Sequence, residues 1–119
     1  GANGVRLYGN DPSLDHRPFL DEAERQELQV LAGISDWPYT QMKGSCKSTN
    51  WNCYAQLKEQ YGLNLRNGFL RSRTRYHPAI KAVILVNEPD LKFSSPGELD
   101  ARRFCRAIVS AFDAVLDAE

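Results

Sequence analysis

The run IKAVILV, residues 80–86, constrains the fold of this chain more than any other feature of its sequence. Its apolar residues are mostly consecutive, and Pro78 and Pro89 bound the segment on either side. A short apolar run between turn residues is typical of a strand, and consecutive apolar residues indicate burial on both faces of a parallel sheet. The sequence therefore predicts a strand over 80–87 within a parallel sheet.

Other predicted strands and helices alternate along the chain. VRLYG and LQVLAGI predict strands over 5–9 and 28–34. The expected helices cover residues 18–26, 51–61, 66–76 and 97–117. This order of strands and helices favours an α/β fold in which right-handed crossovers build a parallel sheet. The length of 119 residues is that of one domain, which we place at 1–119.

Capping residues set the expected ends of two helices. Thr49 or Asn50 can serve as the N-cap of the helix over 51–61, and Gly62 as its stop. Ser95 and Glu98 have capping-box spacing before the last helix. The apolar stripe of that helix consists of Leu99, Phe104, Ile108, Ala111 and Val115. We therefore expect a long amphipathic helix that covers the sheet.

The charge of the chain is balanced, with 15 basic and 15 acidic residues. A net charge of zero gives no electrostatic reason to expect nucleic acid as the main partner. No apolar run approaches the roughly 20 residues that span a bilayer. Four arginines gather in one expected helix: Arg66, Arg71, Arg73 and Arg75. A solvated helix face accounts for them, and a nucleic-acid-binding patch is the alternative. The sequence thus predicts no nucleic-acid partner and no membrane insertion.

The spacing of the cysteines and histidines does not indicate a metal site. Cys46 and Cys53 lie seven residues apart in a polar loop and could pair, which would favour an oxidising compartment such as a secreted or cell-wall location. Cys105 falls in an apolar helix pattern, so we expect it in the core. Neither histidine has a partner at recognised ligand spacing, and no G-x-G-x-x-G follows a strand. We therefore expect no metal and no cofactor.

Polar and aromatic residues follow each predicted strand, at 8–11, 35–39 and 87–90. Ligands bind at the carboxyl ends of parallel strands both in barrels and in doubly wound sheets. We therefore predict a sugar-binding rim, in which Asp36 and Trp37 form a platform. The alternative is that Trp37 packs under the long loop. His77 precedes its strand, so we expect it at the opposite end of the sheet in a structural role.

Three stretches of the sequence resemble one family of proteins. RYHPAIKAVILVNEPDL resembles the fourth-strand region of the clan of retaining glycoside hydrolases built on (β/α)8 barrels, whose strand ends in Asn-Glu-Pro. GANGVRLYGND is similar to the second strand of the same barrels, particularly in β-1,3-glucanases and their transglycosylating relatives, and LQVLAGIS falls where the third should. The resemblance implies a partial (β/α)8 barrel with about three consecutive βα units.

The resemblance also implies roles for single residues. Glu88 matches the general acid/base, and Asn87 matches the residue that hydrogen-bonds the sugar 2-hydroxyl. Arg6 matches an arginine that lies near the nucleophilic carboxylate and keeps it ionised. Tyr8 follows Arg6 on the same rim as a substrate-binding residue. These residues would bind and process a β-glucan or a related oligosaccharide.

The chain also departs from the family. A retaining mechanism needs a second carboxylate roughly 5 Å from the first, and the clan takes it from the seventh strand. The chain covers strands two to four only, so we expect an inactive fragment of a β-glucan hydrolase or transglycosylase. Neighbouring sequence or an associated protein would cover its exposed strand edges. Ser35, Asp36 and Trp37 follow the third strand without the histidine of some families. The alternative is a non-catalytic carbohydrate-binding or structural subunit.

Overall fold

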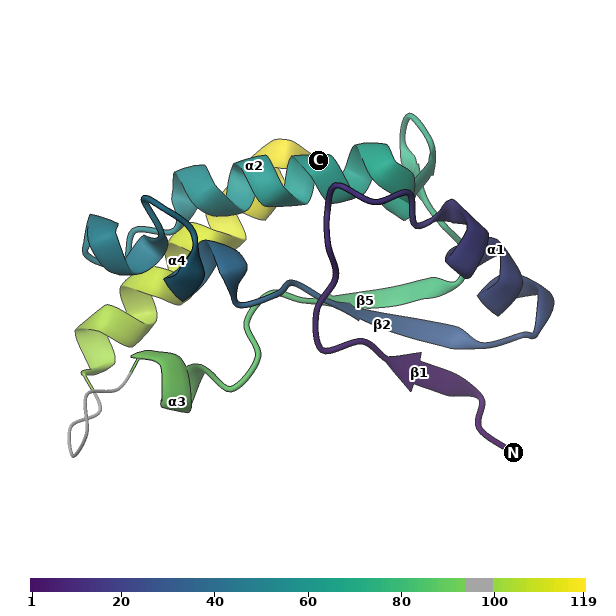
Figure 1. Cartoon of the computed structure of the whole chain (residues 1–119), viewed down its shortest axis with the longest axis horizontal. Coiled ribbons are helices and arrows are strands. Elements are labelled where there is room, and N and C mark those ends of the chain that lie inside the picture. The colour runs from purple at the N-terminus through teal and green to yellow at the C-terminus, as the bar shows by residue number, and fades with distance from the viewer. Residues whose placement is uncertain (94–99) are drawn as a thin grey trace.

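The protein has an α/β fold built on a small parallel sheet (Figure 1). The computed structural model describes residues 1–93 and 100–119. Three strands form the sheet in the order β1-β2-β5, with both neighbouring pairs parallel. Their bounds are Gly4–Arg6 for β1, Gln29–Gly33 for β2 and Ile80–Ile84 for β5. The parallel sheet that the strand pattern predicted is therefore confirmed.

Two long helices lie side by side on one side of this sheet, as Figure 1 shows. The helices of the described residues are α1 (Arg17–Arg25), α2 (Tyr54–Asn64), α3 (Pro89–Phe93) and α4 (Ala101–Ala118). Three alanines of α4, at 107, 111 and 114, are fully buried, and their small side chains let α4 approach α2 closely. The core therefore lies between the sheet and this helix pair. No described helix is both long enough and apolar enough to cross a bilayer.

The two faces of the sheet differ in burial. Val5 and Val30 are paired across β1 and β2 and face the core. Arg6, Leu31 and Ala82 form the next row across all three strands, and all three are exposed, Leu31 by 39%. The expectation that 80–87 is buried on both faces is therefore wrong. Helices of the described chain cover one face only, and β5 lies at the edge of the sheet.

A shift in register lies near the start of β5. Val30 pairs with Ile80 whereas Leu31 pairs with Ala82, so Lys81 is the extra residue on the β5 side. The side chain of Lys81 is exposed at the outer strand of the sheet. Beside this edge, Phe112 and Leu116 of α4 are more than half exposed and line an open groove of about 330 Å³ with β5.

The helix expected over 66–76 is wrong. A π-helical turn (Leu65–Phe69) leads into an antiparallel hairpin of β3 (Leu70–Ser72) and β4 (Arg75–Tyr76). The chain leaves the helix at Gly68, whose φ of +125° favours glycine and where a Cβ would lie 2.8 Å from the backbone nitrogen of Arg17. Gly62, the expected stop, lies inside α2. The four arginines at 66–75 are exposed, three of them on or beside this hairpin rather than on a helix face.

The loop that precedes α2 is held by a disulfide bond. Cys46 and Cys53 are bonded and fully buried, which resolves the pairing that the sequence left open. Asn50 and Trp51 between them have positive φ, so α2 begins at Tyr54 instead of residue 51. Cys53 occupies the N-cap position, and its N–H donates to Ser110 Oγ of α4 at 2.8 Å. Residue 105, the third cysteine, is exposed, so its expected place in the core is wrong.

Helix α4 begins with a side-chain cap. The Asp100 carboxylate accepts hydrogen bonds from the backbone N–H groups of Arg102 and Arg103 at 3.0 and 3.2 Å. Such a cap satisfies backbone donors that the first helical turn leaves free. The capping box expected at Ser95 and Glu98, and the stripe position Leu99, lie outside the described residues.

Candidate active site at the carboxyl edge of the sheet

Two glycines bring the ends of β1 and β2 into close contact. A Cβ on Gly33 would lie 2.4 Å from the carbonyl oxygens of both Leu7 and Tyr8, and a Cβ on Gly9 would lie 2.9 Å from Ser35 Cα. Only a residue without a side chain allows this approach. The segments that follow the two strands therefore run directly against each other at the carboxyl edge.

Glu88 lies at this edge with an exposed carboxylate. The strand expected over 80–87 ends at Ile84, so Asn87 and Glu88 belong to the loop between β5 and α3. The φ of Glu88 is +47°, a left-handed conformation that a non-glycine residue adopts at an energetic cost. Glu88 Oε2 accepts a hydrogen bond of 2.7 Å from the hydroxyl of Tyr8. The loops after β1 and β5 thus meet at the carboxylate that the sequence singled out.

The buried side chain of Asn87 connects the same loops through hydrogen bonds. Its side chain is only 2% exposed, and its Oδ1 accepts a hydrogen bond of 2.8 Å from Arg6 Nη2. Its Nδ2 donates to the carbonyl oxygens of Tyr8 at 2.5 Å and Ile34 at 3.2 Å. Both hydrogens of the amide are therefore used within the protein, and Asn87 positions the segments that follow β1 and β2. Its predicted contact with a sugar 2-hydroxyl stays a prediction.

Lys92 is part of the site and was missed from the sequence. Its side chain is 8% exposed, and its Nζ pairs with Asp36 Oδ1 at 2.8 Å, lies 3.3 Å from the Tyr8 hydroxyl and donates to the Asn87 carbonyl oxygen. Lys92 follows Glu88 by four residues, and the proline after Glu88 is a common first residue of a helix. Helical spacing from Glu88 was thus the signal that could have identified it.

The charges around Tyr8 are balanced. The Arg6 guanidinium lies 5.8 Å and the Lys92 ammonium 5.3 Å from the centre of its ring. The pKa of Tyr8 is raised above its usual value of 10.0, chiefly because its hydroxyl donates to Glu88. Loss of that proton would place a second negative charge beside the carboxylate. Tyr8 therefore remains a hydrogen-bond donor toward Glu88 at neutral pH.

Trp37 lies on a different part of the edge. Its side chain is 50% exposed and lines a cavity of about 470 Å³ whose lining includes neither Tyr8 nor Glu88. The structure thus brings together Arg6, Tyr8, Asp36, Asn87 and Glu88, and it places Trp37 outside this group. Tyr39, two residues further, is buried and donates to the Leu85 carbonyl oxygen at 2.7 Å.

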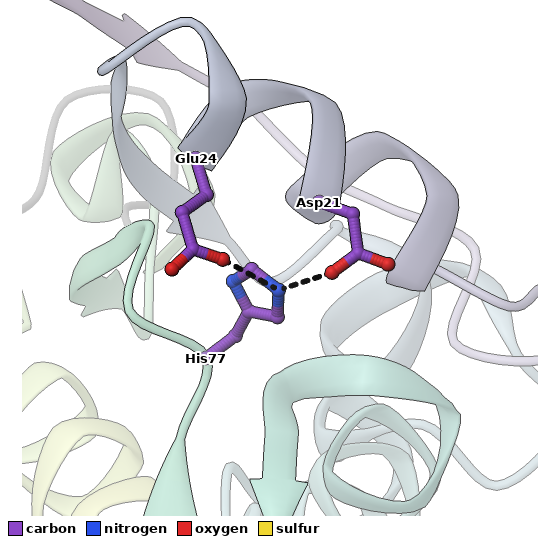
Figure 2. A group of neighbouring side chains, drawn as sticks. All are labelled: Asp21, Glu24 and His77. Atoms are coloured by element: carbon purple, nitrogen blue, oxygen red, sulfur yellow. Dashed lines mark hydrogen bonds and ion pairs between the residues drawn. The ribbon is translucent and has the colours of Figure 1, made fainter.

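A second polar cluster lies at the opposite end of β5, where His77 precedes the strand. Figure 2 shows Asp21 and Glu24 of α1 directed toward the buried imidazole of His77. Its Nε2 lies 3.1 Å from Asp21 Oδ1 and 3.9 Å from Glu24 Oε2. One histidine and two carboxylates within 4.8 Å of one another could hold a metal ion, a combination that the sequence spacing did not indicate.

The hydrogen bonds of this cluster favour a structural network over a metal site. The backbone N–H of Ala79 donates to His77 Nδ1 at 3.3 Å, so in the neutral ring Nε2 carries the proton and donates to Asp21. A metal-bound histidine instead donates from its second nitrogen. Arg71 also donates to Asp21 Oδ1 at 3.0 Å and to Glu24 Oε2 at 2.7 Å. The cluster therefore joins α1 to the hairpin, in line with the structural role expected for His77.

No family model matches this chain, and neither the curated proteins nor the solved structures searched contain a match.

Proposed function

We propose that this chain is the part of a (β/α)8 retaining β-glycosidase that carries the general acid/base, Glu88. The observation that carries the proposal is the convergence on Glu88 of the segments that follow three parallel strands. Tyr8 follows β1 and donates to the carboxylate, and Asp36 follows β2 and is joined to Tyr8 through Lys92. Catalytic groups in such barrels come from the ends of several strands.

The backbone and the exposure of Glu88 support the same assignment. A general acid must reach the glycosidic oxygen of a bound sugar, and the Glu88 side chain is exposed. Its left-handed backbone is an outlier of a kind that clusters at active sites. The uncovered row of Arg6, Leu31 and Ala82 on the sheet is in keeping with the inner face of a barrel. We assign the second carboxylate, needed about 5 Å away, to another strand of that barrel.

An affinity label tests the role of Glu88 in the chain as it exists. An epoxyalkyl β-glucoside presents its epoxide where the glycosidic oxygen of a β-glucan would lie. A carboxylate that attacks the epoxide carbon forms an ester, the epoxide C–O bond breaks, and the resulting alkoxide takes a proton from water. We expect one adduct, located on Glu88 by mass spectrometry and absent from Glu88→Gln. The exposed Glu59, on the outer side of α2, provides the matched control variant, Glu59→Gln.

The controls separate recognition from general reactivity. An epoxide without the sugar should leave Glu88 unlabelled at the same concentration, because binding of the sugar brings the epoxide to the carboxylate. Equal labelling by both reagents, or a glucoside adduct spread over other carboxylates, would refute the assignment. The alternative of a non-catalytic carbohydrate-binding subunit predicts sugar binding without an adduct on Glu88.

Turnover provides a second test in any form of the protein that hydrolyses β-glucosides. Glu88→Gln should slow the cleavage of substrates with poor leaving groups by about 10²–10⁴-fold, the usual contribution of a general acid. Substrates with activated leaving groups need no proton, so their first step should be spared. An equal loss on both kinds of substrate would contradict the role of general acid.

A further inference from the structure

The cavity of about 470 Å³ beside Trp37 has the size of a small-molecule site, for which about 300–1,000 Å³ is typical. Three parts of the chain form its walls. The segment after β1 contributes Asn10 and Asp11, the segment after β2 contributes Ser35 and Trp37, and α2 contributes Gln60. Glu88 is not among its lining residues, so the cavity is distinct from the proposed catalytic group.

Gln60 contributes an amide to the wall of the cavity. Its side chain is only 9% exposed, and its amide makes no hydrogen bond to any residue in the described parts of the chain. Gln56, one turn earlier on the same helix, donates to the Gly44 carbonyl oxygen at 2.6 Å. Neither atom of the Gln60 amide is fully enclosed by the protein, so the amide remains accessible on the wall of the cavity. The Gln60 amide therefore offers the cavity both a donor and an acceptor.

Asn10 adds a second amide to the same wall. Its Nδ2 donates to the Gly33 carbonyl oxygen at 2.9 Å, which fixes the side chain against the end of β2. Its Oδ1 is buried and has no hydrogen-bond partner among the described residues. Trp37 contributes the half-exposed face of an indole ring. Two amides, of which that of Asn10 is held in place, together with an aromatic surface suit a ligand that has polar groups on its rim and an apolar face.

The charge of the cavity selects among such ligands. Its lining contains no lysine and no arginine, and its single charged residue is Asp11. The pKa of Asp11 is lowered, chiefly because its carboxylate accepts a hydrogen bond of 2.7 Å from the Ser13 hydroxyl. Asp11 is thus ionised at neutral pH, and it disfavours phosphates and carboxylates as ligands. The cavity therefore suits a neutral ligand.

We propose that this cavity binds one neutral sugar ring, with the ring face on Trp37 and its hydroxyl groups on the amides of Gln60 and Asn10. The proposal goes beyond the catalytic role of Glu88 and does not depend on it. The same sugar chemistry has two sources. The ring can be one unit of a longer β-glucan that also passes Glu88, or it can be a free monosaccharide.

Side-chain NMR signals of the ¹⁵N-labelled chain test the proposal. Glucose, a β-linked glucose tetrasaccharide and glucose 6-phosphate are titrated separately. Glucose and the tetrasaccharide should shift the Trp37 indole N–H and the Gln60 side-chain amide in a saturable way. Trp51, which is buried in the core, provides the internal control and should not move. Glucose 6-phosphate should bind at least about tenfold more weakly than glucose, because it meets Asp11 without a cation.

Two variants probe the walls of the cavity independently. Trp37→Ala should weaken glucose binding by about tenfold through the lost ring contact, and Gln60→Leu by about three- to tenfold through the lost hydrogen bonds. Glu59→Gln, the neighbour on the exposed side of the same helix, should leave binding unchanged. Thermal unfolding of each variant establishes that it is folded. The Trp37 side chain is half exposed at the start of a π-helical turn (Trp37–Gln41), so its variant remains informative if Gln60→Leu is unstable.

The outcomes decide both the site and the source of the ligand. Tighter binding of the tetrasaccharide than of glucose identifies a unit of a glucan chain, whereas equal binding identifies a free monosaccharide. Saturable glucose binding in an unmodified chain whose Glu88 is not affinity-labelled would keep this proposal and refute only the catalytic assignment. A Trp37 signal that moves with neither sugar, or shifts that persist in both Trp37→Ala and Gln60→Leu, would overturn the proposal.

Discussion

Replacing Asn87 by alanine should destabilise the whole fold, although the residue lies in a loop. The variant removes the donor to the carbonyl oxygens of Tyr8, which is partly buried, and of Ile34, which is buried, and it removes the acceptor for Arg6. A buried polar group left without a partner costs about 1–3 kcal/mol, and the partly buried Tyr8 carbonyl adds less than this, so the two together should cost about 2–4 kcal/mol. Arg6 is exposed and can turn to water, so we add nothing for it.

This loss is large enough to measure by thermal unfolding. For a chain of this size, 1 kcal/mol corresponds to about 4 °C, so Tm of Asn87→Ala should fall by about 10 °C. Asn3→Ala is the matched control, because Asn3 is exposed and its side chain has no hydrogen bond within the described residues. Its Tm should stay within about 1 °C of the unmodified protein.

The same experiment separates two roles for Asn87. A residue that positions the strand ends changes Tm in the absence of any sugar. A residue that only contacts a sugar leaves Tm unchanged and weakens sugar binding. If Tm of Asn87→Ala lay within about 2 °C of the unmodified protein, the reasoning from its three hydrogen bonds would be refuted.

Three further predictions concern other parts of the fold. Gly33→Ala should lower the free energy of unfolding, measured in urea, by about 1–3 kcal/mol, because the new methyl group meets two backbone carbonyl oxygens. An unchanged urea midpoint would argue against the close approach of the ends of β1 and β2. Reduction of the Cys46–Cys53 bond should lower the free energy of unfolding by about 2–3 kcal/mol, because the unfolded chain regains the entropy that the short closed loop had removed. In the oxidised native protein a thiol reagent should modify Cys105 alone. Two or three reactive thiols would contradict the pairing. The pKa of Asp21 is lowered below 3.8, chiefly by His77, so its contribution to stability is complete above about pH 4 and is lost as the pH falls through the lowered value. Asp21→Asn should therefore be less stable at pH 7 and should show a weaker decline in stability below pH 4, whereas an unaltered pH profile would show that the contact with His77 does not contribute.

The three sheet strands were predictable because each is a short apolar run between turn residues, and such runs signal strands through local sequence alone. The hairpin at 70–76 was not predictable, because it depends on the contact of Gly68 with Arg17, which is distant in the sequence. Gly68 takes a positive φ where its backbone passes α1, and no side chain fits there. Gly62 meets only the end of the flexible Arg66 side chain, so α2 continues through it. Local sequence gives the two glycines equal weight as helix stops.

The candidate site was likewise predictable in part from the sequence. Strand ends of a parallel sheet meet at one edge, so the grouping of Tyr8, Asp36 and Glu88 followed from the order of the strands. The internal hydrogen bonds of Asn87 and the burial of Lys92 depend on how far the loops fold back, and spacing does not encode that distance. Gln60 also escaped notice, because a glutamine in a helix is normally a surface residue.

The register shift at Lys81 bears on how the protein behaves in concentrated solution. An outer strand with unpaired backbone groups next to exposed apolar residues is a template for association between chains. Lys81 places a positive charge near the start of β5, beside Phe112 and Leu116. An exposed lysine on an outer strand is one of the features by which proteins disfavour edge-to-edge association.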